Sequence, residues 1–289
     1  MTKLLEISDL TLSFKELFAT TDVLHGISLS IAAGERVALV GESGSGKSVT
    51  ARIILGLLQE TKTAHITGDV VFEGKDISGM VRRDRARLRG TEMSMIFQDP
   101  TSSLNPTFTI GRQFIEILRR RDGNRAKADC LLRATEMLDE VSIPNPERVL
   151  ASYAFQLSGG MNQRVMIAMA LANQPKLLLA DEPGTALDVS VQAQTLDLMR
   201  NMVTDHRTAV LFISHNLGVV REFADRVFVI YRGNIVEDGP TAAIFADPRH
   251  AYTRALMSAV PRITGAGLPE VPEVSEAFLA PQISHGDVA

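Results

Sequence analysis

Cysteines and long apolar runs are almost absent from this chain of 289 residues, and each absence excludes a class of protein. The single cysteine, Cys130, excludes an intramolecular disulfide and a cysteine-rich metal site, and favours a reducing compartment. No apolar run approaches the roughly 18–20 residues that span a bilayer, so we expect any work at a membrane to go through a partner. The first ten residues, MTKLLEISDL, lack the apolar segment and cleavage site of a signal peptide.

The overall composition is that of an ordinary soluble globular protein, with 45% hydrophobic and 22% charged residues. A formal net charge of −4 gives no overall case for nucleic-acid binding, so we expect no nucleic-acid partner. The length suffices for one large domain, or for one core with a subdomain and a tail.

Hydrophobic periodicity predicts an α/β protein. Residues 4–14 and 24–31 alternate apolar and polar side chains, as half-buried antiparallel strands do. Residues 36–40 form a short apolar run typical of a buried strand, and 49–58 have helical spacing. Shorter strands are expected at 70–72, near a sheet edge, and at 93–97, whereas 82–89 is expected to be a solvated basic helix face.

The middle and the second half of the chain continue this pattern. Residues 110–145 are expected to be mainly helical, with a break at 122–124. Strands and helices then alternate, which predicts a parallel sheet, over 177–180, 189–204, 209–213, 217–224 and 227–231. The tail after about residue 262 is rich in Gly, Pro and Glu and is expected to be irregular.

Residues 41–48 read GESGSGKS, a glycine-rich loop between the predicted strand and helix. In that context the loop predicts a phosphate cradle, because glycines let successive N–H groups face phosphate oxygens at a helix N-terminus. The Lys47 ammonium is expected to reach the β- and γ-phosphates, and the Ser48 hydroxyl to bind Mg²⁺. The expected nucleotide-binding residues here are Gly41, Glu42, Ser43, Gly44, Ser45, Gly46, Lys47, Ser48 and Val49.

Two adjacent carboxylates end the apolar run LLLADEP at 177–183. Asp181 ends a buried strand, where a carboxylate without a cation would be costly, and a Mg²⁺ contact explains it economically. Glu182 is placed to act as the general base on the attacking water. The alternative for Glu182 is a structural carboxylate that precedes Pro183 at a helix entry.

Three further side chains are weaker candidates on their own. Gln98 ends a strand and could sense both the γ-phosphate and the attacking water, and His215 follows an apolar strand and could bind the γ-phosphate. Phe14 is a candidate for stacking on adenine, with a core position as the alternative and Phe18 as its rival.

A second glycine-rich string, LSGGMNQR, occupies 157–164. A serine hydroxyl, two bare glycine N–H groups and a helix dipole make a second anion site at the start of a helix. Within one subunit that site has no evident use, whereas across a dimer it completes the phosphate shell. The residues expected to contribute are Ser158, Gly159, Gly160 and Gln163.

With these motifs in order, and with ALD at 186–188, residues 3–240 resemble the nucleotide-binding subunit of an ABC transporter. The resemblance implies an ATP-binding P-loop core with a mainly parallel sheet, an antiparallel β subdomain and a helical subdomain inserted at about 99–165. It also implies a head-to-tail dimer that buries two ATP molecules, with Asp188 in the loop that communicates between the sites. The expected cofactors are ATP and Mg²⁺, the latter held by Ser48, Gln98 and Asp181.

Three stretches narrow the resemblance to the dipeptide/oligopeptide branch of ABC importers, namely 97–111, 181–199 and 251–262. The branch implies a nucleotide-binding domain over 1–250 and a C-terminal extension over 251–289. Many relatives carry a cysteine cluster there that resembles an iron–sulfur site, and because no cysteine follows Cys130 we expect no such cluster. Three positions depart from the usual pattern while keeping every catalytic side chain: Asn162, Gly184 and Asn216.

The predicted function is therefore ATP hydrolysis that powers uptake of peptides or related small solutes. The implied partners are a second ABC ATPase, identical or paralogous, two transmembrane permeases and, indirectly, an extracytoplasmic solute-binding protein. The implied location is peripheral, on the cytoplasmic face of the inner membrane. The alternatives are an exporter ATPase, a soluble ABC ATPase of DNA repair or translation, and a degenerate subunit that does not hydrolyse ATP; the transported solute stays open.

Overall fold

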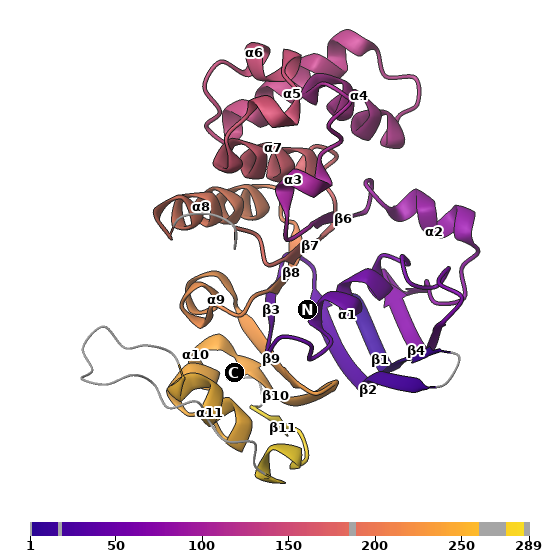
Figure 1. Ribbon diagram of the computed structural model, residues 1–289, viewed down its shortest axis with the longest axis vertical. Coiled ribbons are helices and arrows are strands. Elements are labelled where there is room, and N and C mark those ends of the chain that lie inside the picture. The colour runs from indigo at the N-terminus through magenta and orange to yellow at the C-terminus, as the bar shows by residue number, and fades with distance from the viewer. Residues whose placement is uncertain (1, 17–18, 185–188, 260–275, 286–289) are drawn as a thin grey trace. The chain divides into compact units, whose positions relative to one another are not determined.

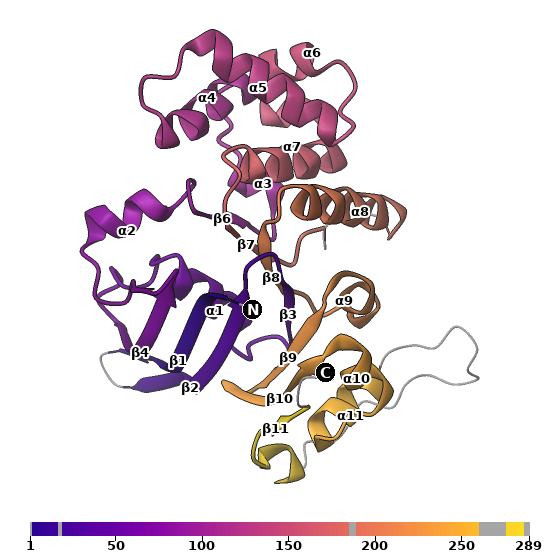
Figure 2. The same ribbon diagram turned by 180° about the vertical axis from the view of Figure 1, so that it is seen from behind.

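The computed structural model describes residues 2–16, 19–184, 189–259 and 276–285 (Figures 1 and 2). The chain divides into two compact units, which we describe separately. The first unit comprises residues 1–79 and 211–289, and the second comprises residues 80–210.

The first unit contains an antiparallel sheet in the order β2-β1-β4-β5. Alternation buries Leu5 and Ile7 of β1, and after a register shift between Ile7 and Leu10 it buries Leu10 and Leu12. The two predicted strands are confirmed, and the strand expected at 70–72 is longer and not at the edge, because β5 lies outside it. The bounds are β1 Lys3–Lys15, β2 Thr20–Ala32, β4 Ala64–Phe72 and β5 Lys75–Asp76.

A second set of strands in this unit has the order β11-β10-β9-β3. The strands are β3 (Arg36–Val40), β9 (Arg226–Tyr231), β10 (Asn234–Pro240) and β11 (Ile283–Ser284). β3 pairs with β9 in parallel, β10 with β9 antiparallel, and β11 with β10 in parallel. The predicted buried strand at 36–40 is confirmed, since every residue of β3 after Arg36 is buried.

The helices of the first unit are α1 (Lys47–Ile54), α9 (Leu217–Phe223), α10 (Thr241–Ala246) and α11 (Ala251–Ser258). α1 begins two residues earlier than predicted, directly after Gly46, and ends four residues earlier. Gly56, in the left-handed region at φ +69°, follows that end, and a left-handed glycine is a common helix stop.

The structure of the C-terminal tail differs from the sequence-based expectation. Residues 276–285 are not irregular: they form the 3₁₀ turn η2 (Glu276–Leu279) and strand β11. The backbone hydrogen bonds of β10 give β11 a pairing partner, which composition alone did not indicate. Residues 260–275 lie outside the described part of the chain.

The second unit contains the parallel strands β6 (Met93–Ile96) and β7 (Leu177–Asp181) and a group of helices. The predicted helical region and its break are confirmed, since α4 ends at Arg121 and α5 begins at Lys127. The unit includes more residues than the helical insertion expected at 99–165, because β6, β7 and α8 also belong to it. Its helices are α2 Arg82–Leu88, α3 Pro100–Ser103, α4 Ile110–Arg121, α5 Lys127–Glu140, α6 Pro146–Ala151, η1 Ala154–Gln156, α7 Gly159–Leu171 and α8 Val189–Asp205.

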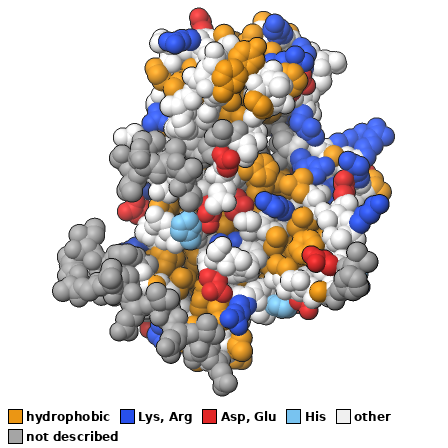
Figure 3. All heavy atoms as spheres, viewed as in Figure 1, with side chains coloured by type: hydrophobic (Ala, Val, Ile, Leu, Met, Phe, Trp, Pro, Cys, Tyr) orange, Lys and Arg blue, Asp and Glu red, His pale blue; other side chains and the backbone are white. Residues whose placement is uncertain are grey.

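α2 has the solvated basic face that the sequence predicts, and Lys and Arg side chains gather over it in Figure 3. Arg82, Arg83 and Arg87 are exposed, whereas Arg85 is buried and donates to the carbonyl oxygen of Met80. Strand β8 (Ala209–Ile213), at the boundary between the units, is buried throughout, as expected for its apolar run.

Candidate nucleotide site

In the first unit the glycine-rich loop joins β3 to α1, the strand–loop–helix order that a phosphate cradle requires. Two of its glycines are required by close approach. A Cβ on Gly41 would lie 2.0 Å from the carbonyl oxygen of Ile230, and one on Gly46 would lie 2.5 Å from Cδ2 of Leu24. Gly46 also has φ +107°, a left-handed conformation that favours glycine.

Lys47 is the charged centre of this loop. Its side chain is buried, and its ammonium donates to the carbonyl oxygens of Gly41 (2.9 Å) and Glu42 (2.7 Å). The side chain therefore curls back over the start of the loop, whose tip at Glu42, Ser43 and Gly44 is exposed. This arrangement keeps a positive charge beside the open tip.

The residues of the loop fit a phosphate group. Among the described residues, the buried hydroxyl of Ser45 has no hydrogen-bond partner, although a buried hydroxyl normally has one. A phosphate oxygen would satisfy that hydroxyl, the Lys47 ammonium and the first N–H groups of α1.

The predicted Mg²⁺ ligands have suitable chemistry, because hydroxyl, amide and carboxylate oxygens are the hard ligands that Mg²⁺ prefers. Ser48 belongs to the first unit, and Gln98 and Asp181 to the second. Within the described ranges, no group of three or more His, Cys, Asp or Glu could hold a metal ion. Mg²⁺ is usually bound by few protein ligands together with substrate phosphates.

In the second unit Gln98 and Glu182 meet, although 84 residues separate them. The parallel register pairs Ile96 with Ala180, so both strands end at the same level and each candidate lies two residues further on. The amide Nε2 of Gln98 donates to Oε2 of Glu182 at 2.8 Å. Asp181, the last residue of β7, is 5% exposed, as predicted for a carboxylate at the end of a buried strand.

The LSGG string begins a helix, as predicted. Ser158 is the N-cap of α7, its hydroxyl accepts the N–H of Met161 at 3.3 Å, and Gly159 and Gly160 are the first two helical residues. Gln163 lies in the second turn of α7, where its side chain is fully buried. Within the described residues, its amide nitrogen and oxygen have no hydrogen-bond partner, and its contact with nucleotide stays a prediction.

The remaining predicted residues lie on several different elements. His215 is exposed in the turn between β8 and α9, and Phe14 is half-buried near the end of β1. Val49 is half-buried in the first turn of α1. Asp188 and Phe18 lie outside the described residues.

One contact at the loop was not predicted. The backbone N–H of Glu42 donates to the hydroxyl of Tyr252 in α11, 210 residues away, at 2.9 Å. Tyr252 stands in one of the stretches that resemble peptide importers, but no local signal relates it to the glycine-rich loop.

Comparison with known proteins agrees with this geometry. Residues 24–185 match the ABC transporter family, and residues 236–278 match the C-terminal region of oligopeptide/dipeptide transporters. The second match begins within β10, earlier than the extension expected from residue 251.

Curated relatives cover most of this chain. It is 45% identical to the oligopeptide transport ATP-binding protein OppD of Bacillus subtilis, over 94% of this chain and 75% of that protein. It is 50% identical to the peptidoglycan transport ATP-binding protein YejF of Agrobacterium fabrum, over 90% of this chain. The chain spans only 47% of that longer protein.

Solved structures share the fold. One is a dimeric ATP-binding cassette in a post-hydrolysis state, bound to ADP and Pi, with 27% identity and a TM-score of 0.73. It aligns with 82% of this chain and 98% of that chain. No helix in the described ranges is long and apolar enough to cross a membrane.

The phosphate cradle, the Gln98–Glu182 pair and the capped LSGG helix thus occur in a chain whose family match covers residues 24–185. The predicted α/β P-loop fold and the predicted ATPase activity are both confirmed. The chain belongs to the ABC transporter family and is one of the ATP-hydrolysing subunits that associate with membrane transporters.

Proposed function

We propose that this subunit powers the import of peptides or related small solutes. The main support is the match of residues 236–278 to the C-terminal region of oligopeptide/dipeptide transporters. The chain is also 45% identical to relatives that are named for peptide transport. The proposal includes two permeases, an extracytoplasmic solute-binding protein and a position on the cytoplasmic face of the inner membrane.

The proposed dimer follows from two incomplete half-sites. The glycine-rich loop of one subunit supplies Lys47 and Ser48, and Ser158 with its two glycines supplies a second set of donors without an evident ligand in its own subunit. Dimeric cassettes among the structural relatives support this pairing. We propose a paralogous partner ATPase, with a second copy of this chain as the alternative.

The proposed chemistry assigns one task to each side chain. Lys47 stabilises negative charge on the β- and γ-phosphates, and Glu182 takes a proton from the attacking water. Gln98, His215 and the Asp188 loop would respond to the γ-phosphate. Ser48, Gln98 and Asp181 would hold Mg²⁺, which neutralises phosphate charge when bound.

In the described conformation Gln98 already donates to the Glu182 carboxylate. A carboxylate has two oxygens and about four acceptor sites, so one such hydrogen bond is compatible with a role of Glu182 as the base. The strands β6 and β7 hold the two side chains at one edge of the sheet.

Glu182→Gln tests the assignment of the base. Without a group that accepts the proton, we expect phosphate release from MgATP to fall by roughly 10²–10⁴-fold, while ATP binding persists. The measurement is phosphate release at several protein concentrations, alone and with the co-expressed permeases. Activity that rises faster than the concentration of the chain indicates composite sites between two copies.

Glu222→Gln, on the short helix α9, is the matched control because it makes the same chemical change outside the proposed site. Rapid turnover by Glu182→Gln would contradict the assignment of the base. A transporter that carries other solutes but no peptide into membrane vesicles would contradict the proposed substrate class and leave the ATPase assignment intact.

A further inference from the structure

We infer that Tyr252 is a positioning residue for the glycine-rich loop, through which the C-terminal segment sets nucleotide affinity. The inference rests on the assignment of this loop as the ATP cradle, and not on the identity of the transported solute. All the residues that carry it belong to the first unit.

The contact concerns a single peptide group. The Tyr252 hydroxyl accepts from the N–H of Glu42 at 2.9 Å, and the Lys47 ammonium donates to the carbonyl oxygen of Gly41, on the same peptide plane, at 2.9 Å. Because a peptide unit is planar, these two hydrogen bonds fix its orientation from both ends. The direction of this peptide in turn defines where the Lys47 ammonium rests.

Tyr252 is held firmly enough for this task. It is 5% exposed, and its ring centroid lies 4.3 Å from that of Tyr231 on β9 and 5.6 Å from that of Phe278 in η2. Tyr231 and Phe278 also meet edge to face at 5.7 Å. Burial, above all, raises the pKa of Tyr252 to about 12, so the hydroxyl stays neutral beside a phosphate site at working pH.

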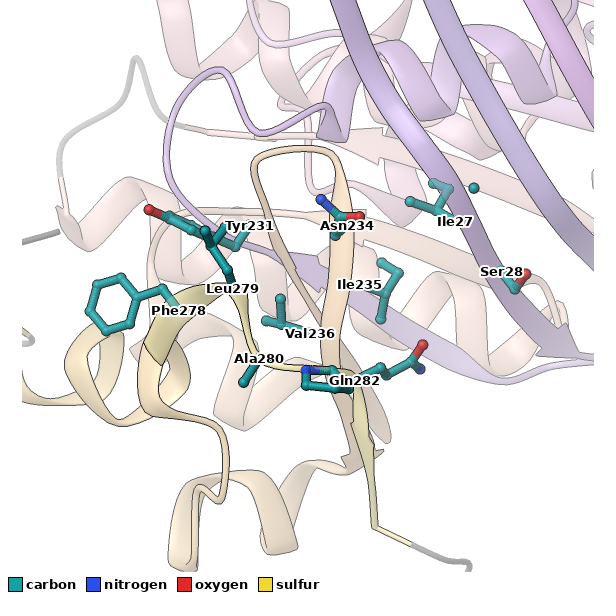
Figure 4. A pocket seen from close by; sticks show the side chains of 12 residues that line it. Ile27, Ser28, Tyr231, Asn234, Ile235, Val236, Phe278, Leu279, Ala280 and Gln282 are labelled. Carbon is teal, nitrogen blue, oxygen red and sulfur yellow. The ribbon is translucent and has the colours of Figure 1, made fainter. Parts of the chain in front are cut away.

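The C-terminal segment completes this aromatic cluster. Figure 4 shows Phe278 and Leu279 of η2 beside Tyr231, at a cavity of about 340 Å³. Beyond η2, β11 pairs with β10, and Nε2 of buried His285 lies 2.6 Å from Oε1 of buried Glu237.

The same carboxylate anchors the helix that presents Tyr252. Glu237 accepts the N–H groups of Arg249 (2.8 Å) and His250 (3.0 Å), and Nδ1 of His250 accepts the N–H of Tyr252 as the N-cap of α11. A continuous set of contacts therefore runs from β11 through α11 to the Gly41–Glu42 peptide. Displacement of the C-terminal segment would remove Phe278 from the ring of Tyr252 and loosen the loop.

Tyr252→Phe tests the hydroxyl alone, because the ring stays. In a Glu182→Gln background, which prevents ATP consumption, we expect the dissociation constant of MgATP to rise roughly three- to tenfold, the range for one hydrogen bond. When Tyr252→Phe is made alone, with Glu182 unchanged, KM for ATP should rise while kcat changes less than twofold. Amide hydrogen exchange at Glu42, measured without nucleotide, should accelerate by a similar factor.

Tyr231→Phe is the matched control, since it removes a hydroxyl from the same aromatic cluster, and within the described residues no hydrogen bond joins that hydroxyl to the loop. We expect its dissociation constant and Glu42 exchange to match the parent. An unchanged dissociation constant in Tyr252→Phe overturns the inference, as does equal weakening by Tyr231→Phe. The exchange measurement needs no nucleotide or permease, so its outcome does not depend on the proposed import function.

Phe278→Leu tests the role of the C-terminal segment. Loss of the edge-to-face contacts should let the Tyr252 ring move, and we expect at least a twofold rise in the dissociation constant. An unchanged value would overturn the link to the C-terminal segment.

Discussion

Single residues that depart from the usual family pattern have local structural roles in this chain. Asn162 is 4% exposed and its amide donates to the carbonyl oxygen of Ala154 at 3.0 Å, a position suited to a short amide. Gly184 has φ +96°, a left-handed conformation that favours glycine over threonine. Asn216 is the N-cap of α9, and its Oδ1 accepts the N–H groups of Gly218 and Val219.

Asn216 gives a residue-scale prediction. Asn and Asp are equally good N-caps, so Asn216→Asp should change the free energy of unfolding by less than about 0.5 kcal/mol, whereas Asn216→Ala should cost about 1 kcal/mol. Urea unfolding of the two variants and the parent measures both effects. An Asn216→Ala variant as stable as the parent would show that the side-chain cap does not stabilise α9.

At the scale of elements, buried carboxylate contacts join β10, α11 and β11. Glu237 of β10 is fully buried and accepts hydrogen bonds from the start of α11 and from His285 after β11. Burial by itself would raise the pKa of Glu237. The adjacent Thr253, the N–H groups of Arg249 and His250, and His285 together bring the pKa below its ordinary value.

A lowered pKa predicts how stability depends on pH. Because the folded state binds the Glu237 proton more weakly than the unfolded state, the stabilisation is fully present above the ordinary pKa of 4.5. It is lost as the pH falls through that value toward the folded pKa. We therefore expect the urea midpoint of the parent to fall more steeply between pH 5 and pH 3 than that of Glu237→Gln.

Asp238→Asn is the matched control, because Asp238 is the neighbouring carboxylate on the same strand but is only half-buried. It should keep the steep pH dependence of the parent. Parallel curves for the parent and Glu237→Gln would show that Glu237 does not contribute this stability.

At the scale of the whole molecule, two compact units each have their own core. The core of the second unit includes fully buried side chains on α4 and α5, among them Phe114, Leu118 and Met137. Cys130, the single cysteine of the chain, is also fully buried there. Its thiol therefore reports opening of this unit alone.

We expect the Cys130 thiol to be protected from reagent in the native protein, because reaction requires α5 to open. The measurement is the rate of reaction with a thiol reagent across a urea series, and the rate should rise as the second unit opens. Leu132→Cys in a Cys130→Ala background is the exposed control on the same helix, since Leu132 is 64% exposed. Equal native rates for the two thiols would contradict the buried position.

The sequence by itself determined the features that are local in the chain. The strand–loop–helix order around Lys47, the helix that begins after Ser158 and the family all follow from residues that are close together, because backbone conformation and motif spacing are short-range properties. Most predicted elements are confirmed within a few residues, and the roles of the site residues stay predictions.

Only the tertiary structure decided which distant residues meet. The hydrogen bond between Gln98 and Glu182 depends on the parallel register of β6 and β7, and that of Tyr252 to the Glu42 N–H depends on how α11 packs on β9 and η2. Residues 283–284 become a strand because the backbone of β10 pairs with them, although the composition of the tail after residue 262 as a whole predicts irregular structure.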